Sequence, residues 1–405
     1  MDPAPASSAP VDPKLQRSSL AALPAYPYFA FLILGQVTVA AVLQLASLPL
    51  GLALSEVFIF AAPAFLLSRA ANYKPASLLA LRTPSPLLVL LGLLAGASNF
   101  LVAGGLQILV RSFVPAEYAK RFDAAHLFQG VGGAELILVV VSLGLFAPVC
   151  EEIAFRGWIQ PILGARSSGT WSVVLTAILF AILHLDPIGM AARIELGVLF
   201  GLLALWTRSL WPAIAAHAAN NLIAAGLLVA ALTGPERVAQ APTSPLKALA
   251  LAAAGLAGVV LILLVVRRKT SGLPERVLES ADPAQDHHPT ARRAGAWLPA
   301  WMGTAIVCGV ALMALRWNAF QVALADAATP PQPTLQKLPD EPARKALEKR
   351  LVEAKKQAQS GEVDLERYKA LRQRLVALGK ADGGLTLEAA TTALEAAGEP
   401  DAGAR

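Results

Sequence analysis

The chain has 405 residues, of which 56% are hydrophobic and 15% are charged, and its mean hydropathy is +0.56. Because soluble domains carry about 25% charged residues, this composition excludes an ordinary soluble protein and predicts a polytopic membrane protein surrounded by lipid. The net charge is +6. The basic residues lie mostly between apolar runs, which is typical of topology signals, so no nucleic acid is expected as a partner.

The N-terminal residues 1–26 are rich in Pro, Ala and Ser. No short apolar segment with a cleavage site follows them, so they are interpreted as a disordered leader before an uncleaved first span. Nine later stretches are apolar, and as helices each is long enough, or almost long enough, to cross roughly 30 Å of hydrocarbon. They are residues 27–48, 51–68, 86–110, 134–156, 171–187, 191–207, 211–232, 246–266 and 297–315. The sequence therefore predicts an all-α transmembrane bundle of about eight or nine spans.

Basic residues between the spans predict the orientation of the chain. The loop from Arg267 to Arg293 carries the strongest cluster of basic residues and is assigned to the cytoplasm. Alternation of the spans then places Lys14 and Arg17 on the same side. We therefore expect a multi-pass protein of the cell (inner) membrane with a cytoplasmic N-terminus.

The composition changes after Arg316 to a Pro-rich linker followed by charged sequence with helical periodicity. Residues 317–405 are interpreted as this linker and a small helical tail outside the membrane. Ser360 and Gly361 interrupt the periodic leucines and predict the turn of a hairpin, and a weaker helix is expected near 386–396. We expect residues 340–396 to be a solvated appendage or a binding surface for a protein partner, rather than a second catalytic unit.

Three charged residues, Glu151, Glu152 and Arg156, lie in the fourth apolar run. Charges at that depth are costly and usually mark a functional site. Glu152 and Arg156 are four residues apart, so on a helix they share a face and can neutralise each other. Glu151 lies about 100° round the helix and is left unpaired. An unpaired carboxylate in an apolar pocket is suited to take a proton from water near neutral pH.

Two later apolar runs carry further polar side chains. His184 could share the water with Glu151 or orient it. His217 and Asn221 are four residues apart and share a helix face, where an imidazole and an amide could donate hydrogen bonds to a developing oxyanion. Glu56, Glu135 and Glu195 also lie in or near spans but have no partnered motif, so they are expected to be structural.

These residues form three boxes in order. They are E-E-x-x-x-R at Glu151, Glu152 and Arg156, F-x-x-x-H at Phe180 and His184, and H-x-x-x-N at His217 and Asn221. Together they resemble the CAAX protease and bacteriocin-processing family, which includes endopeptidases that remove the last three residues of prenylated proteins. The resemblance covers about residues 134–230.

The resemblance implies an intramembrane endopeptidase with a catalytic core at 133–232, between N-terminal spans at 27–132 and additional spans at 233–316. It implies that Glu151 is the general base and His184 its water-positioning partner. His217 and Asn221 would stabilise the oxyanion, and Glu152 with Arg156 would form a supporting pair. The expected substrate is a membrane-associated protein or peptide.

Two other functions remain open. The two histidines and a glutamate could bind zinc, with the second glutamate as base, as in soluble metalloproteases. The H-E-x-x-H helix of those enzymes is absent, so a reaction without metal or cofactor is favoured. A non-catalytic scaffold or immunity protein could instead keep the boxes while the tail recruits a partner. A scaffold has no need of an intact base, histidine and asparagine.

The orientation leads to a first testable prediction. An odd number of spans after a cytoplasmic N-terminus places the tail beyond Arg316 on the non-cytoplasmic side. A reporter fused after Arg405 that is active only outside the cytoplasm should therefore be active. Activity of the matched cytoplasmic reporter at the same position would show that the spans beyond residue 240 are miscounted.

Overall fold

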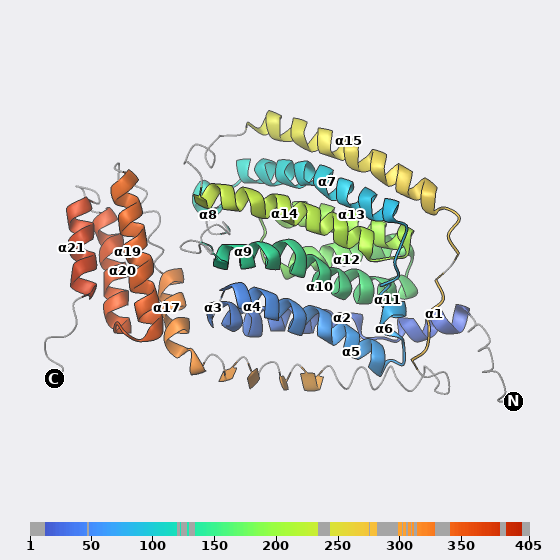
Figure 1. The fold of residues 1–405 in the computed structure, drawn as a ribbon, viewed down its shortest axis with the longest axis horizontal. Coiled ribbons are helices and arrows are strands. Elements are labelled where there is room, and N and C mark those ends of the chain that lie inside the picture. The colour runs from blue at the N-terminus through green and yellow to red at the C-terminus, as the bar shows by residue number, and fades with distance from the viewer. Residues whose placement is uncertain are drawn as a thin grey trace. The chain divides into compact units, whose positions relative to one another are not determined.

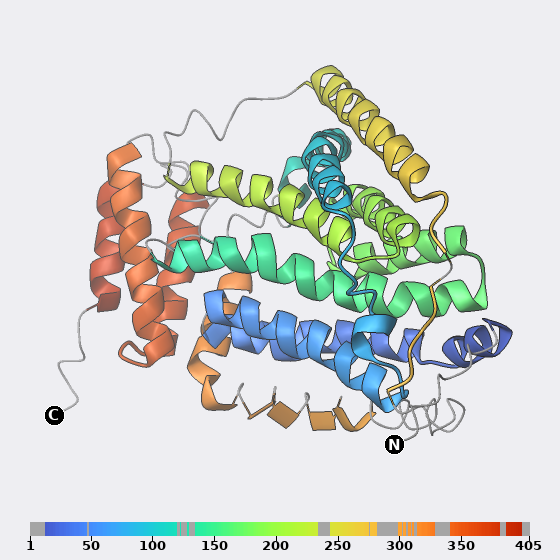
Figure 2. The ribbon, with the colours of Figure 1, turned by 45° about the vertical axis from the view of Figure 1, so that its right-hand side comes forward.

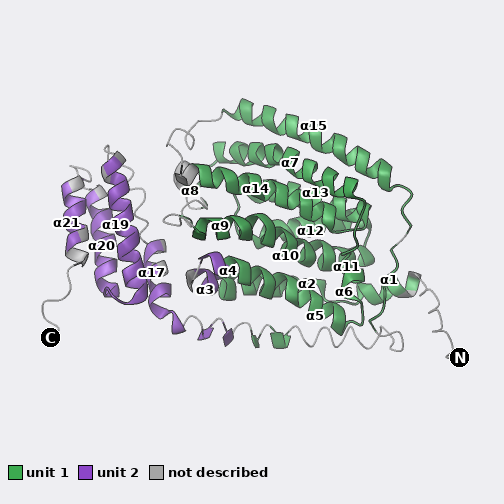
Figure 3. Ribbon diagram, viewed as in Figure 1, with its two compact units in different colours: residues 1–40, 52–306 green, residues 41–51, 307–405 purple. Residues whose placement is uncertain are grey.

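The structure is a computed structural model of the full chain. It describes residues 13–46, 48–119, 122, 128, 134–233, 244–274, 276–281, 299–301, 303–304, 307–308, 310–311, 314–328, 341–380 and 386–398. The regular elements in these ranges are helices, and one isolated bridge joins Tyr73 to Ser280 (Figure 1). The predicted all-α class is confirmed. The chain divides into two compact units, residues 1–40 with 52–306 and residues 41–51 with 307–405 (Figure 3).

The transmembrane prediction is confirmed for seven of the nine stretches. Seven helices of the described residues are long and apolar enough to cross a membrane, namely Gln16–Gln44, Leu48–Ala70, Pro86–Ser112, Ala134–Arg166, Met190–Thr207, Trp211–Ala230 and Pro245–Thr270. A shorter apolar helix, Gly169–Leu183, corresponds to the predicted fifth span. The ninth stretch, 297–315, lies largely outside the described residues. The chain is a multi-pass membrane protein.

The first two spans each contain a π-helical segment between α-helices. The first span consists of α2 (Ala25–Gly35), η1 (Gln36–Ala40) and α3 (Ala41–Ala46), and the second of α4 (Leu48–Ser55), η2 (Glu56–Ala61) and α5 (Ala62–Ala70). Short α6 (Pro75–Leu78) then leads to the unbroken α7 (Pro86–Ser112), and α8 (Ala116–Ala119) follows it.

The remaining spans of the first unit carry the predicted site. The fourth span consists of α9 (Ala134–Val141), η5 (Ser142–Phe146), α10 (Ala147–Glu152), η6 (Ile153–Ile159) and α11 (Gln160–Arg166). It is followed by α12 (Gly169–Leu183), α13 (Met190–Thr207), α14 (Trp211–Thr233) and α15 (Pro245–Thr270). Each begins or ends close to the predicted boundary.

Residues 13–21, which the sequence places in the disordered leader, form the helix α1 (Pro13–Ala21), while residues 1–12 lie outside the described residues. Two arginines hold α1 against the end of α11. Arg17 donates to the carbonyl groups of Ala165 and Ser167, and Arg166 donates to those of Ala21 and Leu23. Each arginine thus satisfies carbonyl groups that a helix end leaves without an internal partner. Composition alone does not reveal such reciprocal capping.

The helices of the first unit pack in a consistent order (Figures 1 and 2). Helix α15 packs on α7, and α7 packs on α14. Helix α14 contacts the fourth span, and the other side of the fourth span meets η2 and α2. All residues from Glu151 to Gln160 are buried. The fourth span is therefore enclosed by protein where its charged residues lie, as the cost of lipid exposure requires.

Two glycines, Gly92 and Gly96, allow α7 to approach α14 closely. A Cβ atom at Gly92 would meet the carbonyl oxygen of Pro212, and one at Gly96 would meet that of Ala216. Small residues one turn apart are a common means of bringing two membrane helices together. The contact at Ala216 lies next to His217, so this packing positions the helix that carries the last box.

The second unit contains α17 (Trp317–Ala328), α19 (Glu341–Ser360), α20 (Leu365–Lys380) and α21 (Leu387–Gly398). The predicted hairpin is present, and Gly361 at its turn has the positive φ of +84° that favours glycine. Its core is formed by apolar side chains of three helices, namely Leu347, Leu351, Leu371, Leu375, Ala390 and Ala393. Helix α17 occupies the start of the segment interpreted as a linker. Its Asp326 accepts a hydrogen bond from Tyr368 at 2.7 Å and pairs with Arg372 at 3.1 Å.

The glycine contact leads to a stability prediction. Gly96→Ala should lower the free energy of unfolding by about 1–3 kcal/mol, because the new methyl group overlaps the backbone of α14. Thermal unfolding of the purified protein in detergent measures this loss. Gly104→Ala is the matched control, since nothing lies within 4 Å of a Cβ at that position of the same helix. Equal melting temperatures of the two variants would contradict the close packing.

Candidate active site

The first two site residues, Glu151 and Glu152, end α10, and Arg156 lies in the π-helical segment η6 that follows. Such segments are rare and occur frequently at functional sites. A second one, η5, precedes α10 in the same span. The fourth span thus departs from regular α-helix on both sides of the two glutamates.

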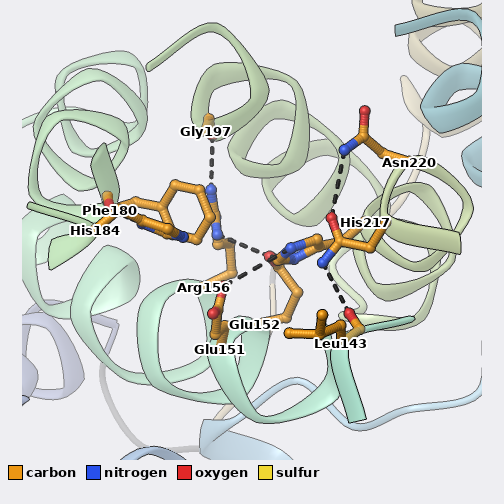
Figure 4. A network of polar contacts seen from close by, with 10 residues as sticks. Leu143, Glu151, Glu152, Arg156, Phe180, His184, Gly197, His217 and Asn220 are labelled. Carbon is orange, nitrogen blue, oxygen red and sulfur yellow. Dashed lines mark hydrogen bonds and ion pairs between the residues drawn. The ribbon is translucent and has the colours of Figure 1, made fainter. Parts of the chain in front are cut away.

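A single oxygen atom, Oε1 of Glu152, joins two of the boxes (Figure 4). Arg156 donates to it from Nη1 at 2.8 Å, and His217 Nδ1 lies 2.9 Å away. The side chains of Glu152 and Arg156 are both 0% exposed. Arg156 also donates from Nη2 to the carbonyl oxygen of Gly197 at 3.0 Å. The buried cation and carboxylate therefore compensate each other's charge, although Glu152 Oε2 and Arg156 Nε have no hydrogen-bond partner among the described residues. Through Glu152 the pair also holds the histidine of α14.

Three phenylalanines surround the buried charges. The guanidinium of Arg156 lies 4.7 Å from the ring centre of Phe180 and 5.3 Å from that of Phe200, with Phe155 at 5.9 Å. The His217 ring stacks on Phe200 with centroids 4.6 Å apart and 18° between the planes. A cation over an aromatic face is stabilised by the ring quadrupole, more strongly when water is excluded. This aromatic enclosure fixes both Arg156 and the plane of the imidazole.

Glu151 faces the other nitrogen of the same imidazole. Its Oε2 lies 3.7 Å from His217 Nε2, too far for a direct hydrogen bond. This oxygen is buried and has no hydrogen-bond partner within the described part of the chain. With the Nδ1 hydrogen assigned to the Glu152 contact, Nε2 is an acceptor in the neutral ring and a donor only when the ring carries both protons. Both atoms are therefore available to a small molecule or a substrate group between them.

His184 follows α12 directly. Its Nδ1 lies 2.9 Å from the carbonyl oxygen of Phe180, so that nitrogen carries the hydrogen and Nε2 is left as an acceptor. The ring meets Phe180 edge to face at 4.8 Å. Phe180 also meets His217 edge to face at 5.8 Å, so its ring contacts both histidines. Among the described residues, His184 and Glu151 make no direct hydrogen bond.

Asn221 lies on α14 one turn after His217. Its amide nitrogen donates to the carbonyl oxygen of Leu143 at 3.0 Å, and its amide oxygen accepts from Asn220 at 3.3 Å (Figure 4). Leu143 belongs to η5, so this π-helical segment offers the acceptor that orients the amide. An amide nitrogen carries two hydrogens. One is used on Leu143, and the other remains for a ligand.

Three residues that support the site were not predicted as part of it. They are Gln160, Phe200 and Asn220. Gln160 donates to the carbonyl oxygen of Gly201 at 3.0 Å, one turn beyond the bond from Arg156 to Gly197. Gln160 is a polar residue in an apolar run and follows Arg156 by four residues. The same spacing of polar residues predicted the pair of Glu152 and Arg156. The apolar sequence around Phe200 gives no comparable signal.

The two acceptor carbonyls belong to glycines that pack tightly on α12. A Cβ at Gly197 would lie 2.7 Å from the Cβ of Ala177, and one at Gly201 would lie 2.9 Å from a methyl carbon of Val173. Gly197 and Gly201 therefore form a close helix contact. The contact brings α13 near enough for Arg156 and Gln160 to reach its backbone.

The site offers two imidazoles and two carboxylates as possible metal donors. Zinc needs three or four ligand atoms at about 2.0–2.3 Å from one point. Among the described residues, no group of three or more His, Cys, Asp and Glu side chains is placed to hold a metal ion. The Phe180 ring contacts both of the histidines that such a site would need.

Comparison with known families concerns the same segment of the chain. Residues 133–223 match the family model described as Type II CAAX prenyl endopeptidase Rce1-like, and all six predicted site residues lie in that segment. This segment, less than a quarter of the chain, is therefore similar to the CAAX prenyl endopeptidases, which are proteases. No curated protein and no solved structure matches the chain.

The buried pair leads to a prediction about stability. Arg156→Ala leaves the fully buried Glu152 without its cation, so the free energy of unfolding should fall by about 3–5 kcal/mol. The melting temperature in detergent and the accumulation in membranes both report this loss. Arg17→Ala removes an exposed arginine that also bonds to carbonyl oxygens and should have a much smaller effect. Equal stability of the two variants would exclude the proposed support.

Proposed function

We propose that the chain hydrolyses a peptide bond near the end of a membrane-associated substrate by direct attack of a water molecule that Glu151 activates. The supporting observation is the pair of atoms formed by Glu151 Oε2 and His217 Nε2. They lie 3.7 Å apart, are buried, and leave the carboxylate oxygen without a partner. A buried unsatisfied acceptor costs about 1–3 kcal/mol and is explained when a water or substrate atom occupies the gap in the working enzyme.

In the proposed reaction, Glu151 takes a proton from water, and the resulting hydroxide attacks the carbonyl carbon of the peptide bond. The carbonyl oxygen becomes an oxyanion, which His217 and the free amide hydrogen of Asn221 stabilise. When the tetrahedral intermediate collapses, the bond to nitrogen breaks, and Glu151 returns its proton to the leaving amine. The products are an amine and a carboxylic acid, which releases its proton to water and becomes a carboxylate. No metal or cofactor takes part.

The remaining site residues have supporting roles in this proposal. Glu152 orients the imidazole through Nδ1 and stabilises the doubly protonated ring that donation from Nε2 requires. Arg156 pairs with Glu152 at 2.8 Å and so compensates its charge in the apolar enclosure. His184 offers Nε2 as an acceptor that positions the water. The orientation of a histidine by a buried carboxylate follows the same logic as in other hydrolases.

The basic residues between the spans favour an orientation. The predicted cytoplasmic N-terminus places the ends of α11 and α13 at the cytoplasmic face of the cell membrane, from which substrate would enter. The helical tail, residues 340–396, would then lie on the opposite side, where it is available to a protein partner. The scaffold alternative is less favoured. A buried carboxylate with an unpartnered oxygen costs free energy and does not help the helices to pack, so a scaffold would have no use for it.

The role of Glu151 can be tested by its amide analogue. Glu151→Gln keeps the shape of the side chain and removes the proton-accepting oxygen, so turnover of a lipid-anchored peptide should fall at least about a hundredfold. The melting temperature should stay close to that of the wild type. Glu135→Gln is the matched control, since Glu135 is an exposed residue at the start of the same span. Undiminished cleavage by Glu151→Gln would disprove the assignment.

Metal removal separates this mechanism from the zinc alternative. After exhaustive chelation, the wild-type enzyme should keep its activity, and elemental analysis should find no stoichiometric metal. Loss of activity that added zinc restores would instead identify a metalloprotease, with Glu151 or Glu152 as its base.

A further inference from the structure

An ion pair near the site, Arg193 with Asp186, has no role in the reaction described above. Arg193 Nη1 donates to Asp186 Oδ2 at 2.7 Å. Asp186 lies in the loop between α12 and α13, and Arg193 lies in the first turn of α13. Their side chains are 25% and 14% exposed, for Arg193 and Asp186 respectively. Arg193 thus differs from Arg156, whose guanidinium is fully enclosed and committed to Glu152.

The backbone of the loop fixes the position of this guanidinium. Asp186 Oδ1 accepts a hydrogen bond from the Ile188 amide at 2.9 Å, so the carboxylate is held in place. A Cβ atom at Gly189 would meet Arg193 Nη1 and would lie 2.6 Å from Asp186 Oδ2. Gly189 has a φ of −85°, which any residue can adopt. The glycine is therefore required for space, and the guanidinium rests directly against it.

Arg193 lies within electrostatic reach of two proposed catalytic groups, Glu151 and His184. The helices that carry these residues can be compared from one common end of the bundle. At that end α11 ends at Arg166, α12 begins at Gly169 and α13 ends at Thr207. At 1.5 Å per residue, all three side chains lie about 20 Å from that end. The cation is therefore at a height along the bundle similar to that of the proposed scissile bond.

The unused donors of Arg193 suit a carboxylate. A guanidinium carries five hydrogens in a planar fork, and Asp186 engages only Nη1. Within the described part of the chain, Nε and Nη2 donate to no protein acceptor. The first peptide N–H groups of α13, an 18-residue helix, add a partial positive charge at the same place. Together they form a half-exposed anion site on the edge of the proposed active site.

The chemistry of the substrate supplies such an anion. A CAAX box is the C-terminal tetrapeptide of a protein, so the residues that follow its prenylated cysteine end in a free α-carboxylate. Three extended residues span at most about 10 Å. A peptide bound with its scissile bond at Glu151 therefore brings its terminal carboxylate within that distance of the base. In an apolar interior this charge needs a cation.

We propose that Arg193, held in place by Asp186 and Gly189, binds the free α-carboxylate of the substrate and so directs cleavage to the end of a chain. This inference rests on the proposed function and adds a specificity residue to it. Arg193 is not required for the attack of water. Its removal should therefore affect only substrates that carry the terminal charge.

Two lipidated peptides that differ only at the C-terminus test this proposal. One ends in an α-carboxylate and the other in an α-carboxamide. The full-length enzyme in liposomes should prefer the carboxylate by at least about tenfold in kcat/KM, as expected for one charge-assisted hydrogen-bond pair. Arg193→Met should bring the ratio close to one by slowing only the carboxylate peptide. Arg193→Lys should keep part of the preference, because the charge remains without the fork.

A second variant guards against misfolding of the first. Gly189→Ala leaves the charge in place but displaces the guanidinium, and it should reduce the preference in the same way. Arg17→Met, which removes an exposed arginine at the helix ends, should leave the ratio unchanged. An Arg193→Met enzyme that keeps the wild-type ratio, or that loses activity equally on both peptides, would show that the ion pair only holds the loop.

Binding without turnover separates this inference from the proposed function. Displacement of a fluorescent lipidated peptide from Glu151→Gln should favour the carboxylate peptide, and Arg193→Met in that background should abolish the difference. If the wild type cleaves neither peptide but this binding difference is present, the proposed reaction is wrong and the carboxylate site stands. If both peptides bind equally, the carboxylate site is wrong whatever the enzyme cleaves.

Discussion

Oε1 of Glu152 accepts from both Arg156 and His217, at 2.8 and 2.9 Å, and the rest of the site depends on this shared acceptor. A lone carboxylate, guanidinium or imidazole at this depth would be costly. Joined through one oxygen, the three groups hold one another and link the fourth span to α14. The geometry also frees His217 Nε2 to face Glu151. Glu151 Oε2 and Glu152 Oε2 both lack a hydrogen-bond partner among the described residues, and it is the Glu151 oxygen that faces His217 Nε2.

Close contacts at glycines bring the backbone of α13 within hydrogen-bonding distance of this network. Gly197 and Gly201 bring α13 against α12, so their carbonyl oxygens accept from Arg156 and Gln160 on successive turns. Gly96 brings α7 against α14 beside His217. In hydrocarbon, close packing and polar contacts between helices replace the hydrophobic driving force. The small residues therefore determine where the polar side chains can meet, and the ion network then fixes the register of the helices.

The parts of the structure that the sequence predicts are those with a local cause. Runs of apolar residues long enough to cross a bilayer predict the seven spanning helices, and a spacing of four places Glu152 beside Arg156. Contacts between distant helices follow from no such pattern. The bond from Glu152 to His217 joins residues 65 positions apart, and the stacking of His217 on Phe200 depends on how α13 and α14 pack. The helix α1 and the π-helical segments likewise depend on tertiary partners.

The segment that matches the family, residues 133–223, does not enclose its own site. Trp158, fully buried in η6, packs edge to face on Tyr28 of the first span at 6.1 Å, and Tyr28 donates to the Phe60 carbonyl oxygen of the second. On the opposite side, α14 needs the glycine face of α7. The spans before the matched segment therefore exclude lipid from the charged network. Since an ion pair exposed to hydrocarbon would be unstable, these spans are as necessary to the site as the residues that form it.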